Sequence, residues 1–530
     1  MSGGPRIESR RLGWVIALIA LNMLLSLVLL VQEVPLIWGL VLFAWLNILL
    51  VAVRRVTAHA FLVGFLVSFF VFLLVRVTMD LVFDFRPFVV QPEVLSGVSK
   101  ILLAGLFGLT VGYLLARVRP NGTENGPSPM RQYAGGETRL GAEHLRIGAL
   151  AVFYIALPLA AFSLARDISF VSGASYAALY TEEFVQRTAG IGAAILQYAH
   201  EVAFVAFVAY LATLPRFRAA RVPVLLWIVY VGSFMLTGRR RDVAVFLLFV
   251  ICYAIARNRI TPDDPWVRPG RAWLAVLAIP VLLAVFGLLE AWRGVGSAGT
   301  GEHGVIPEFI YGQGVSVTVL QNVVAYADQL PDQPYLLEFA RTGVIPRLIG
   351  LPILEGNSVV RALEGGSLSH SLSWLVLGPT RYLSGVSTGT SFLAEGFVEF
   401  GLWGAACVGA AYGLLLAWLD HSRDGDLSAN VLRLLVAQSV LWAPRGTSTG
   451  FIQILLAPST WLGLIAAVLI AALAARHGRR GVSLSTLDQQ MPGPEETVRL
   501  GGAEGLPRPM TSGAAAKLPH IHGPNGRHES

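Results

Sequence analysis

The stretch GWVIALIALNMLLSLVLLV, residues 13–31, decides the fold class of this chain. It holds no charged residue, and it is close to the roughly 20 residues that a helix needs to cross the hydrocarbon core of a bilayer. Similar runs recur along the chain, for example VLLAVFGLL within 272–289 and LGLIAAVLIAALAA at 462–475. Lipid accommodates only helices and closed barrels, and these runs are continuous rather than alternating. The sequence therefore predicts an all-α polytopic integral membrane protein.

The composition of the 530 residues agrees with this class. Hydrophobic residues make up 55% and charged residues only 14%, and the mean hydropathy is +0.63, which is far more apolar than a soluble domain of this size. A pI near 9.6 would indicate nucleic-acid binding in a soluble protein. In a membrane protein the excess of arginine more simply reflects topology, so we expect no nucleic-acid partner.

The N-terminal run could be mistaken for a secretory signal peptide because basic residues precede it. It is not followed by a small-residue cleavage site and leads directly into another apolar segment, so we predict an uncleaved first helix. The two cysteines, Cys252 and Cys407, lie in separate apolar runs and support neither a disulfide nor a metal site. We expect no metal and no cofactor.

Hydropathy predicts about 12 membrane helices, and the positive-inside rule orients them with both termini in the cytoplasm. The predicted domains are a cytoplasmic segment 1–12, a transmembrane domain 13–475 that includes a long extracytoplasmic loop at 290–391, and a disordered cytoplasmic tail 476–530. The predicted helices are 13–31, 35–53, 59–83, 98–117, 147–164, 191–213, 222–237, 242–257, 272–289, 392–419, 430–444 and 452–475.

Three consecutive arginines, Arg239, Arg240 and Arg241, separate two apolar runs in FMLTGRRRDVAVF (234–246). The predicted topology places them outside, where basic residues oppose insertion. Arginine binds phosphate through a planar pair of donors, and this interaction is stronger in a half-dry membrane interface. A lipid-linked diphosphate therefore fits the site. Two alternatives stay open: a miscounted helix, which would make the triplet a cytoplasmic topology signal, and anchoring to anionic lipids.

Three motifs follow one another between residues 170 and 475. SGASYAALYTEEF (172–184) carries paired tyrosines, FMLTGRRRD ends an apolar helix in Thr-Gly-x-Arg, and GTSFLAEGFVEFGLWGAACVGAAYGLLLAW (389–418) carries Gly-x-Ser-x-x-x-Glu and then Phe-Gly-x-x-Gly. In these motifs the chain resembles the bacterial oligosaccharide repeat-unit polymerases of the O-antigen polymerase (Wzy) type. The positions that match the motifs of that family are Tyr176, Tyr180, Arg240, Ser391, Glu395, Phe400, Gly401 and Gly404.

The resemblance implies a glycosyltransferase in the bacterial cytoplasmic (inner) membrane. Such an enzyme transfers a growing glycan from a polyprenyl diphosphate to a hydroxyl of the next lipid-linked repeat unit, outside that membrane and without a nucleotide sugar. Arginines can stabilise the departing diphosphate without a metal. The implied partners are the lipid-linked substrates, membrane lipids and a chain-length regulator. One departure is the triplet itself, since the family usually has a single arginine there.

Carboxylates and histidines on the outer side are the candidates for a general base. Glu395 and Glu399 are four residues apart and are predicted to share one helix face, as base or as partners of the arginines. His370 in the long loop could also act as a base. Gln313 could bind sugar hydroxyls. Arg445, at another outward helix end, could complete a diphosphate clamp with Arg240, although helix-end snorkelling is the alternative.

Two other classes of protein stay open at this stage. His200 and Glu201 lie within a predicted helix, where ionisable residues mark a polar cavity or a proton relay, and this would suit a transporter or flippase of a lipid-linked oligosaccharide. A ligase that transfers the finished glycan would share the donor site. Most of the unexplained polar residues gather at the predicted outer face, which favours chemistry there.

Overall fold

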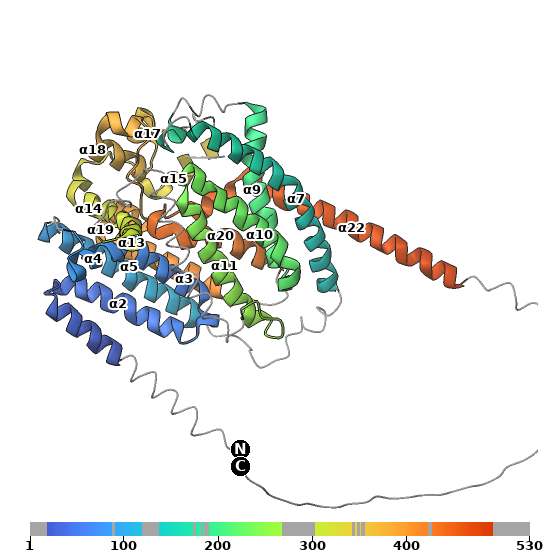
Figure 1. Ribbon diagram of the computed structural model, residues 1–530, viewed down its shortest axis with the longest axis horizontal. Coiled ribbons are helices and arrows are strands. Elements are labelled where there is room, and N and C mark those ends of the chain that lie inside the picture. Colours follow the sequence, from blue (N-terminus) through green and yellow to red (C-terminus); the bar gives the residue numbers. More distant parts are fainter. Residues whose placement is uncertain are drawn as a thin grey trace, which may run out of the picture. The chain divides into compact units, whose positions relative to one another are not determined.

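The computed structural model describes residues 19–86, 91–118, 137–172, 176–181, 184, 190–267, 303–341, 345–346, 350, 354, 356–421 and 427–490. Within these ranges the regular elements are all helical (Figure 1). The chain divides into two units, Met1–Ala475 and Arg476–Ser530. The first unit holds the predicted site.

The helices follow the apolar runs of the sequence. After an apolar helix Ile19–Val31, the first half contains α2 (Leu36–Val53), η1 (Val56–Ala58), α3 (Ala60–Phe69), η2 (Phe70–Leu74), α4 (Val75–Phe83), α5 (Pro92–Val118), α7 (Glu137–Ser172), η3 (Tyr176–Tyr180), α9 (Ile191–Ala212), α10 (Phe217–Ser233), η4 (Phe234–Thr237) and α11 (Arg240–Ile260).

The second half contains α13 (Val305–Gln313), η7 (Gly314–Ser316), α14 (Val317–Tyr326), η8 (Ala327–Gln329), η9 (Tyr335–Leu337), α15 (Glu338–Arg341), α17 (Val359–Glu364), α18 (Leu368–Leu383), α19 (Phe392–Asp420), α20 (Leu427–Trp442), η10 (Ala443–Arg445), α21 (Gly450–Leu456) and α22 (Pro458–Gln490).

Nine helices in the described ranges are long and apolar enough to cross a membrane. This confirms an all-α polytopic membrane protein but not the predicted count of 12. The described part of the first predicted helix is short, and α20 has only 16 residues. The predicted helix 272–289 lies outside the described residues. So do residues 290–302 of the predicted loop 290–391 and the tail beyond residue 490.

One predicted boundary is wrong at 452–475. The chain makes the short helix α21, leaves helical geometry at Ala457 with ψ of 129°, and begins α22 at Pro458. A proline ring disfavours helical backbone in the preceding residue, and proline itself suits the first turn of a helix. The membrane span therefore begins at Pro458.

Helices α5 and α19 form the most extensive contact between helices (Figure 1). Their glycines make it possible. A Cβ atom on Gly108 would lie 2.0 Å from the carbonyl oxygen of Ala406, and one on Gly413 would lie 2.1 Å from that of Leu109. Small residues let two helix backbones approach closely in a membrane, where apolar side chains gain little by leaving lipid. We call this contact the glycine seam.

Replacing Gly108 with leucine is expected to open the glycine seam, because its side chain would meet the backbone of α19. The yield of monodisperse protein in detergent should fall sharply and its Tm should drop. Leu115→Ala, on an exposed position of the same helix, is the control and should behave as wild type. An unchanged Tm in Gly108→Leu would contradict the seam.

Helix α19 is not the single helix that the sequence predicted. Phe400 (φ −137°, ψ 23°) and Gly401 (φ 58°, ψ −144°) interrupt it. The eight residues before the break fold back along the second part, so a Cβ atom on Gly404 would lie 1.9 Å from the carbonyl oxygen of Gly396. Glycine is needed at 401 because its φ is positive. Phe400 and Trp403 are exposed at the tip of this hairpin.

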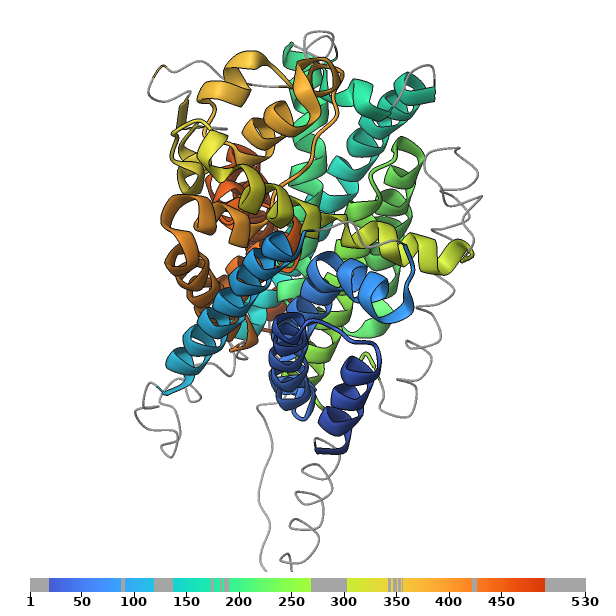
Figure 2. The same ribbon diagram turned by 90° about the vertical axis from the view of Figure 1, so that its left-hand side faces the viewer.

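We call one end of the bundle the loop end. It carries the segments that follow the helix ends predicted to face outward. Helices α17 and α18 lie there (Figures 1 and 2). The backbone amide of Asn357 donates to the Tyr180 carbonyl at 3.0 Å, and its side-chain amide donates to the Tyr382 carbonyl at 2.7 Å. The paired-tyrosine segment is therefore fastened to the long predicted loop.

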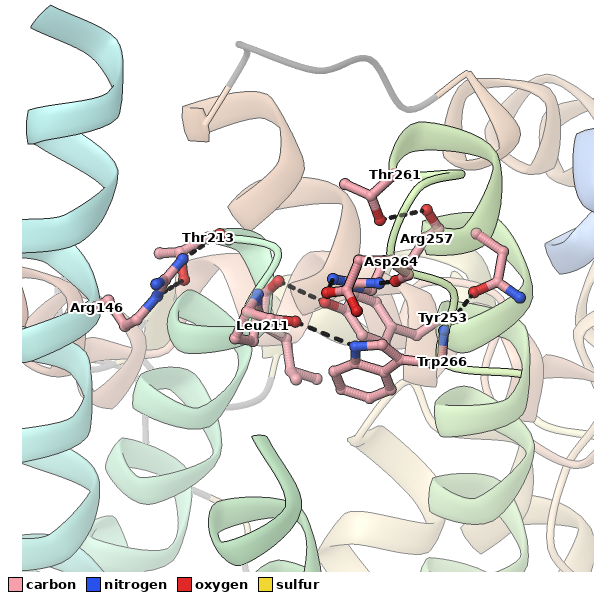
Figure 3. A network of polar contacts seen from close by, with 10 residues as sticks. Arg146, Leu211, Thr213, Tyr253, Arg257, Thr261, Asp264 and Trp266 are labelled. Atoms are coloured by element: carbon pink, nitrogen blue, oxygen red, sulfur yellow. Dashed lines mark hydrogen bonds and ion pairs between the residues drawn. The ribbon is translucent and has the colours of Figure 1, made fainter. Parts of the chain in front are cut away.

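The opposite end is closed by polar networks around arginines. Arg257, which is 1% exposed, donates to the carbonyl and carboxylate of Asp264 and lies 5.3 Å from the Trp266 ring centroid (Figure 3). Asp420 accepts the backbone amide of Phe61 at 2.9 Å, which satisfies a donor at the start of α3. These contacts lock the helices together at the end that the arginine pattern predicts to be cytoplasmic.

Candidate active site

Arg239 precedes α11, Arg240 and Arg241 are its first two residues, and only Gly238 and Arg239 separate this helix from η4. Gly238 has a φ of 96°, which reverses the chain with almost no loop. Arg239 donates from Nε to Asp242 at 2.9 Å and lies 4.5 Å from the Phe234 ring centroid. This residue is therefore held in place by its own helix end. The side chains of Arg240 and Arg241 lie outside the described residues, although their backbone begins α11.

Arg445 lies against two aromatic rings that also contact each other. Its Cζ atom is 5.7 Å from the ring centroids of both Phe72 and Trp442, and these rings meet edge to face at 5.2 Å. Phe72 belongs to η2, a π-helical turn within the third predicted span, and such turns occur frequently at functional sites. The Ser68 hydroxyl donates to the Leu441 carbonyl at 2.6 Å and fastens this helix to α20. Side chains from two helices therefore fix the position of the guanidinium.

Glu395 is fully buried on the short first part of α19. One carboxylate oxygen accepts the Thr390 hydroxyl at 2.9 Å. The other accepts the backbone amide of Ser448 at 2.8 Å and the Ser448 hydroxyl at 2.6 Å. Tyr412 donates to the Ser448 carbonyl at 2.9 Å. Glu395 therefore holds the turn that follows Arg445, and among the described residues it makes no ion pair with an arginine.

Glu399 lies one turn after Glu395 and is half-buried. It accepts the backbone amide of Leu336 at 3.3 Å, so it also orders a segment of the long loop. The two glutamates do share one short helix, as predicted, but they bind different segments. Gln313 ends α13 and is half-buried, and Gly314 next to it packs against the Arg76 side chain.

His370 is half-buried at the start of α18 rather than solvated. Its Nδ1 lies 2.9 Å from the Tyr382 hydroxyl, which donates to the Ser358 carbonyl at 3.1 Å. Burial, and then the charge of Arg361, lowers the pKa of His370 to about 3. The ring is therefore neutral at neutral pH and a weak base. Tyr180 contributes its backbone to this region, and the side chain of Tyr176 lies outside the described residues.

The buried His370 should make the protein sensitive to acid. Its pKa is lower in the folded chain than the ordinary 6.5, so the unfolded chain binds more protons between about pH 6.5 and pH 3. Its contribution to stability is present above pH 6.5 and is lost as the pH falls. The Tm of wild type should therefore fall more steeply between pH 6.5 and 4 than that of His370→Gln, and parallel Tm curves would contradict this.

Ionisable residues inside two other helices have partners. His200 Nδ1 lies 3.0 Å from the Tyr230 hydroxyl, and Glu201 accepts the hydroxyl of Ser459. Arg239 and Asp242 lie within electrostatic range of His200, so this polar cluster belongs to the surroundings of the triplet. Asp80 accepts the Tyr311 hydroxyl at 3.1 Å, and Arg76 lies over the same ring at 4.6 Å.

The structure thus brings Glu395 next to the turn that follows Arg445, and Arg239 next to the His200 cluster. No hydrogen bond or ion pair between described residues joins Arg239 to Arg445. Sequence reasoning missed Phe72, Trp442 and Ser448, which fix the arginine turn. The only available signal was the polar run RGTSTG after α20, because the partners of these residues lie far away in the sequence.

Residues 14–477 match the sequence model of a protein family described as O-antigen polysaccharide polymerase Wzy. The chain belongs to this family. No curated protein and no solved structure matches the chain. Because the matched residues cover most of the chain, they include the arginine triplet, the broken helix and the Arg445 turn.

As a Wzy family member, the protein is a glycosyltransferase-like polymerase that joins lipid-linked oligosaccharide repeat units in O-antigen synthesis. It lies in the inner membrane, in agreement with its nine membrane-crossing helices within the described ranges. Membership favours polymerisation over transport or ligation. The broken α19 gives the Phe-Gly-x-x-Gly pattern of this sequence a physical reason, because Gly401 makes the reversal and Gly404 allows the two parts to touch.

Proposed function

We propose that the protein transfers a glycan from a polyprenyl diphosphate donor to a sugar hydroxyl of a second lipid-linked unit, at the loop end, facing outward, and without a metal. The hydroxyl oxygen attacks the anomeric carbon, the bond from that carbon to the diphosphate oxygen breaks, and the hydroxyl proton passes to a carboxylate. The observation that carries the proposal is Arg445, whose guanidinium lies against Phe72 and Trp442. Glu395 fastens the turn that follows it, through the backbone amide of Ser448.

Two cationic positions suit the two diphosphates that such a reaction needs. Arg240 and Arg241 are the first residues of α11, where the free backbone amides of a helix start favour an anion. Arg445 is the second position. Preorganised cations stabilise the negative charge that develops on a departing diphosphate, and they do so most strongly away from water. We assign the triplet to one lipid carrier and Arg445 to the other.

The two glutamates suit different roles. All the contacts of Glu395 described above come from neutral donors that it orders, so we assign it to positioning the Arg445 turn. Glu399 is only half-buried and is the better candidate for the proton acceptor. Gln313, His370, Tyr176 and Tyr180 remain proposed contacts for the sugar chain, and a chain-length regulator remains a proposed partner.

The first experiment is the sidedness of the loop end. In a Cys252→Ala, Cys407→Ala background, Ser384→Cys at the loop end should react with a membrane-impermeant maleimide in intact cells. Thr57→Cys at the opposite end is the control and should react only after permeabilisation. Both positions are exposed. The reverse pattern would make the triplet a cytoplasmic topology signal and overturn the outward reaction.

The role of the triplet is tested in the same cells. Arg240→Ala should abolish long glycan polymer while a single repeat unit still reaches the lipid carrier, because only the joining step is lost. Arg54→Ala, at the opposite end, removes an exposed arginine and should leave polymer length unchanged. Normal polymer in Arg240→Ala would remove that residue from the two proposed diphosphate positions.

A further inference from the structure

A groove with a volume of about 490 Å³ runs beside the Arg445 turn. Its long wall is the second part of α19, and its other wall is α21 with Leu336. Except for Ser448 and Thr449, nearly all of its lining is apolar. The lining residues are Leu336, Val408, Ala411, Tyr412, Leu414, Leu415, Ser448, Thr449 and Phe451.

We infer that this groove binds the first isoprene units of the lipid carrier whose diphosphate lies at Arg445. The inference rests on the proposed function and deepens it, because it assigns a separate subsite to the hydrocarbon chain. Lining residues from Val408 to Leu415 follow one face of α19 over a length of about 10 Å. A largely apolar lining of this kind suits a hydrocarbon chain rather than a sugar.

The two polar lining residues belong to the turn that follows Arg445. Ser448 is the residue that Glu395 and Tyr412 fix, and Thr449 follows it. The Thr449 hydroxyl oxygen is buried and has no hydrogen-bond partner among the described residues. Thr449 lies four positions after Arg445 in the chain, which limits the distance between their Cα atoms to about 14 Å. A cationic head and an apolar groove thus match the two parts of a prenyl diphosphate.

The apolar part of the groove faces the lipid. It lies on a membrane-crossing helix, and its residue Leu414 is 47% exposed on the protein surface. A hydrocarbon chain could therefore enter from the side without crossing water. Moving from lipid into the groove gains packing contacts but little hydrophobic free energy, since both surroundings are apolar. The fit of the chain to the groove, rather than the hydrophobic effect, should therefore determine the affinity.

The test fills the groove. Ala411→Trp places a ring in the groove, whereas Cys407→Trp adds the same ring one turn away, at an exposed position of α19 that does not line the groove. The full-length protein in phosphatidylethanolamine and phosphatidylglycerol nanodiscs is given one repeat unit on methyl diphosphate, which has no isoprene unit, or on a C55 polyprenyl diphosphate. Ala411→Trp should raise the KM for the C55 substrate about tenfold, which corresponds to about 1.4 kcal/mol.

The same variant should leave the KM for the methyl diphosphate substrate within about twofold, because that substrate has no hydrocarbon chain to make contacts in the groove. Cys407→Trp should leave both values unchanged. Equal KM values in the two variants would overturn the inference. So would an equal loss on both substrates, which would indicate a resident phospholipid or a disturbed helix.

A second measurement does not depend on the variants folding equally well. A C55 diphosphate with a diazirine on its first isoprene units should label peptides that contain 408–415 or 448–451, and Ala411→Trp should reduce this labelling. Labelling confined to other helices would overturn the inference. Absence of polymer from wild type with either substrate would instead overturn the proposed function, and the labelling pattern would still decide the groove.

Discussion

Arg445→Ala should lower the rate of glycan joining by about 100- to 1000-fold, the range expected when a preorganised donor to developing charge is removed. The loss should appear in kcat, because the guanidinium is proposed to act on the departing diphosphate. Arg445→Lys should recover only part of the rate, since an ammonium cannot bind two phosphate oxygens through one planar fork. The measurement is the rate of polymer formation from purified lipid-linked repeats.

A matched control separates this effect from the general loss of a positive charge at the loop end. Arg381 is exposed on α18, and Arg381→Ala should retain the wild-type rate. Phe72→Leu should fall between the two, because it removes one of the rings that aim Arg445 but keeps the charge. A wild-type rate in Arg445→Ala would show that this arginine only anchors a helix end.

Glu395→Ala should lose nearly all polymerisation, whereas Glu395→Gln should keep most of it. The alanine variant leaves the buried Ser448 amide without an acceptor, which costs about 1–3 kcal/mol and frees the turn that carries Arg445. Displacing a catalytic group by about 1 Å can cost about 100-fold in rate. Glutamine can still accept from Ser448 and can donate to the Thr390 hydroxyl.

The glutamine variant therefore distinguishes a positioning role from general-base catalysis. If Glu395 only positions the turn, the pH profile of kcat in Glu395→Gln should have the shape of the wild-type profile. Loss of all activity in Glu395→Gln, together with loss of one limb of the pH profile, would make Glu395 the base and reject the positioning role. Glu399→Gln is the companion variant, and there we expect the large loss.

Much of the fold could be predicted because a membrane helix corresponds to one continuous apolar run in the local sequence. The apolar runs gave the spans that became α2, α5, α9 and α11. The break in α19 was invisible to hydropathy, since both parts are apolar and the reversal depends on one positive φ at Gly401. A membrane span and a hairpin of the same composition look alike in a hydropathy window.

The residue types of the site could be predicted more readily than their partners. Glu395 and Arg445 stood out because charge is costly near a membrane. Their connection through Ser448 joins residues 53 positions apart, and Phe72 lies in a different helix. Tertiary contacts of this kind leave no periodic trace in a single sequence. The sequence suggests Glu395 as a base or as a partner of arginine. It gives no sign of the hydroxyl and amide donors that the fold brings to this carboxylate.

The glycine seam also constrains how the protein is made. Helix α5 leaves the ribosome and enters the membrane long before its partner α19 has been synthesised, and until then its notched face must border lipid or another helix. Glu395 is part of α19, and the turn after Arg445 is hydrogen-bonded to it. A nascent chain therefore lacks a complete site until its last third has been inserted. A product truncated before α19 would carry the arginine triplet without the rest of the site.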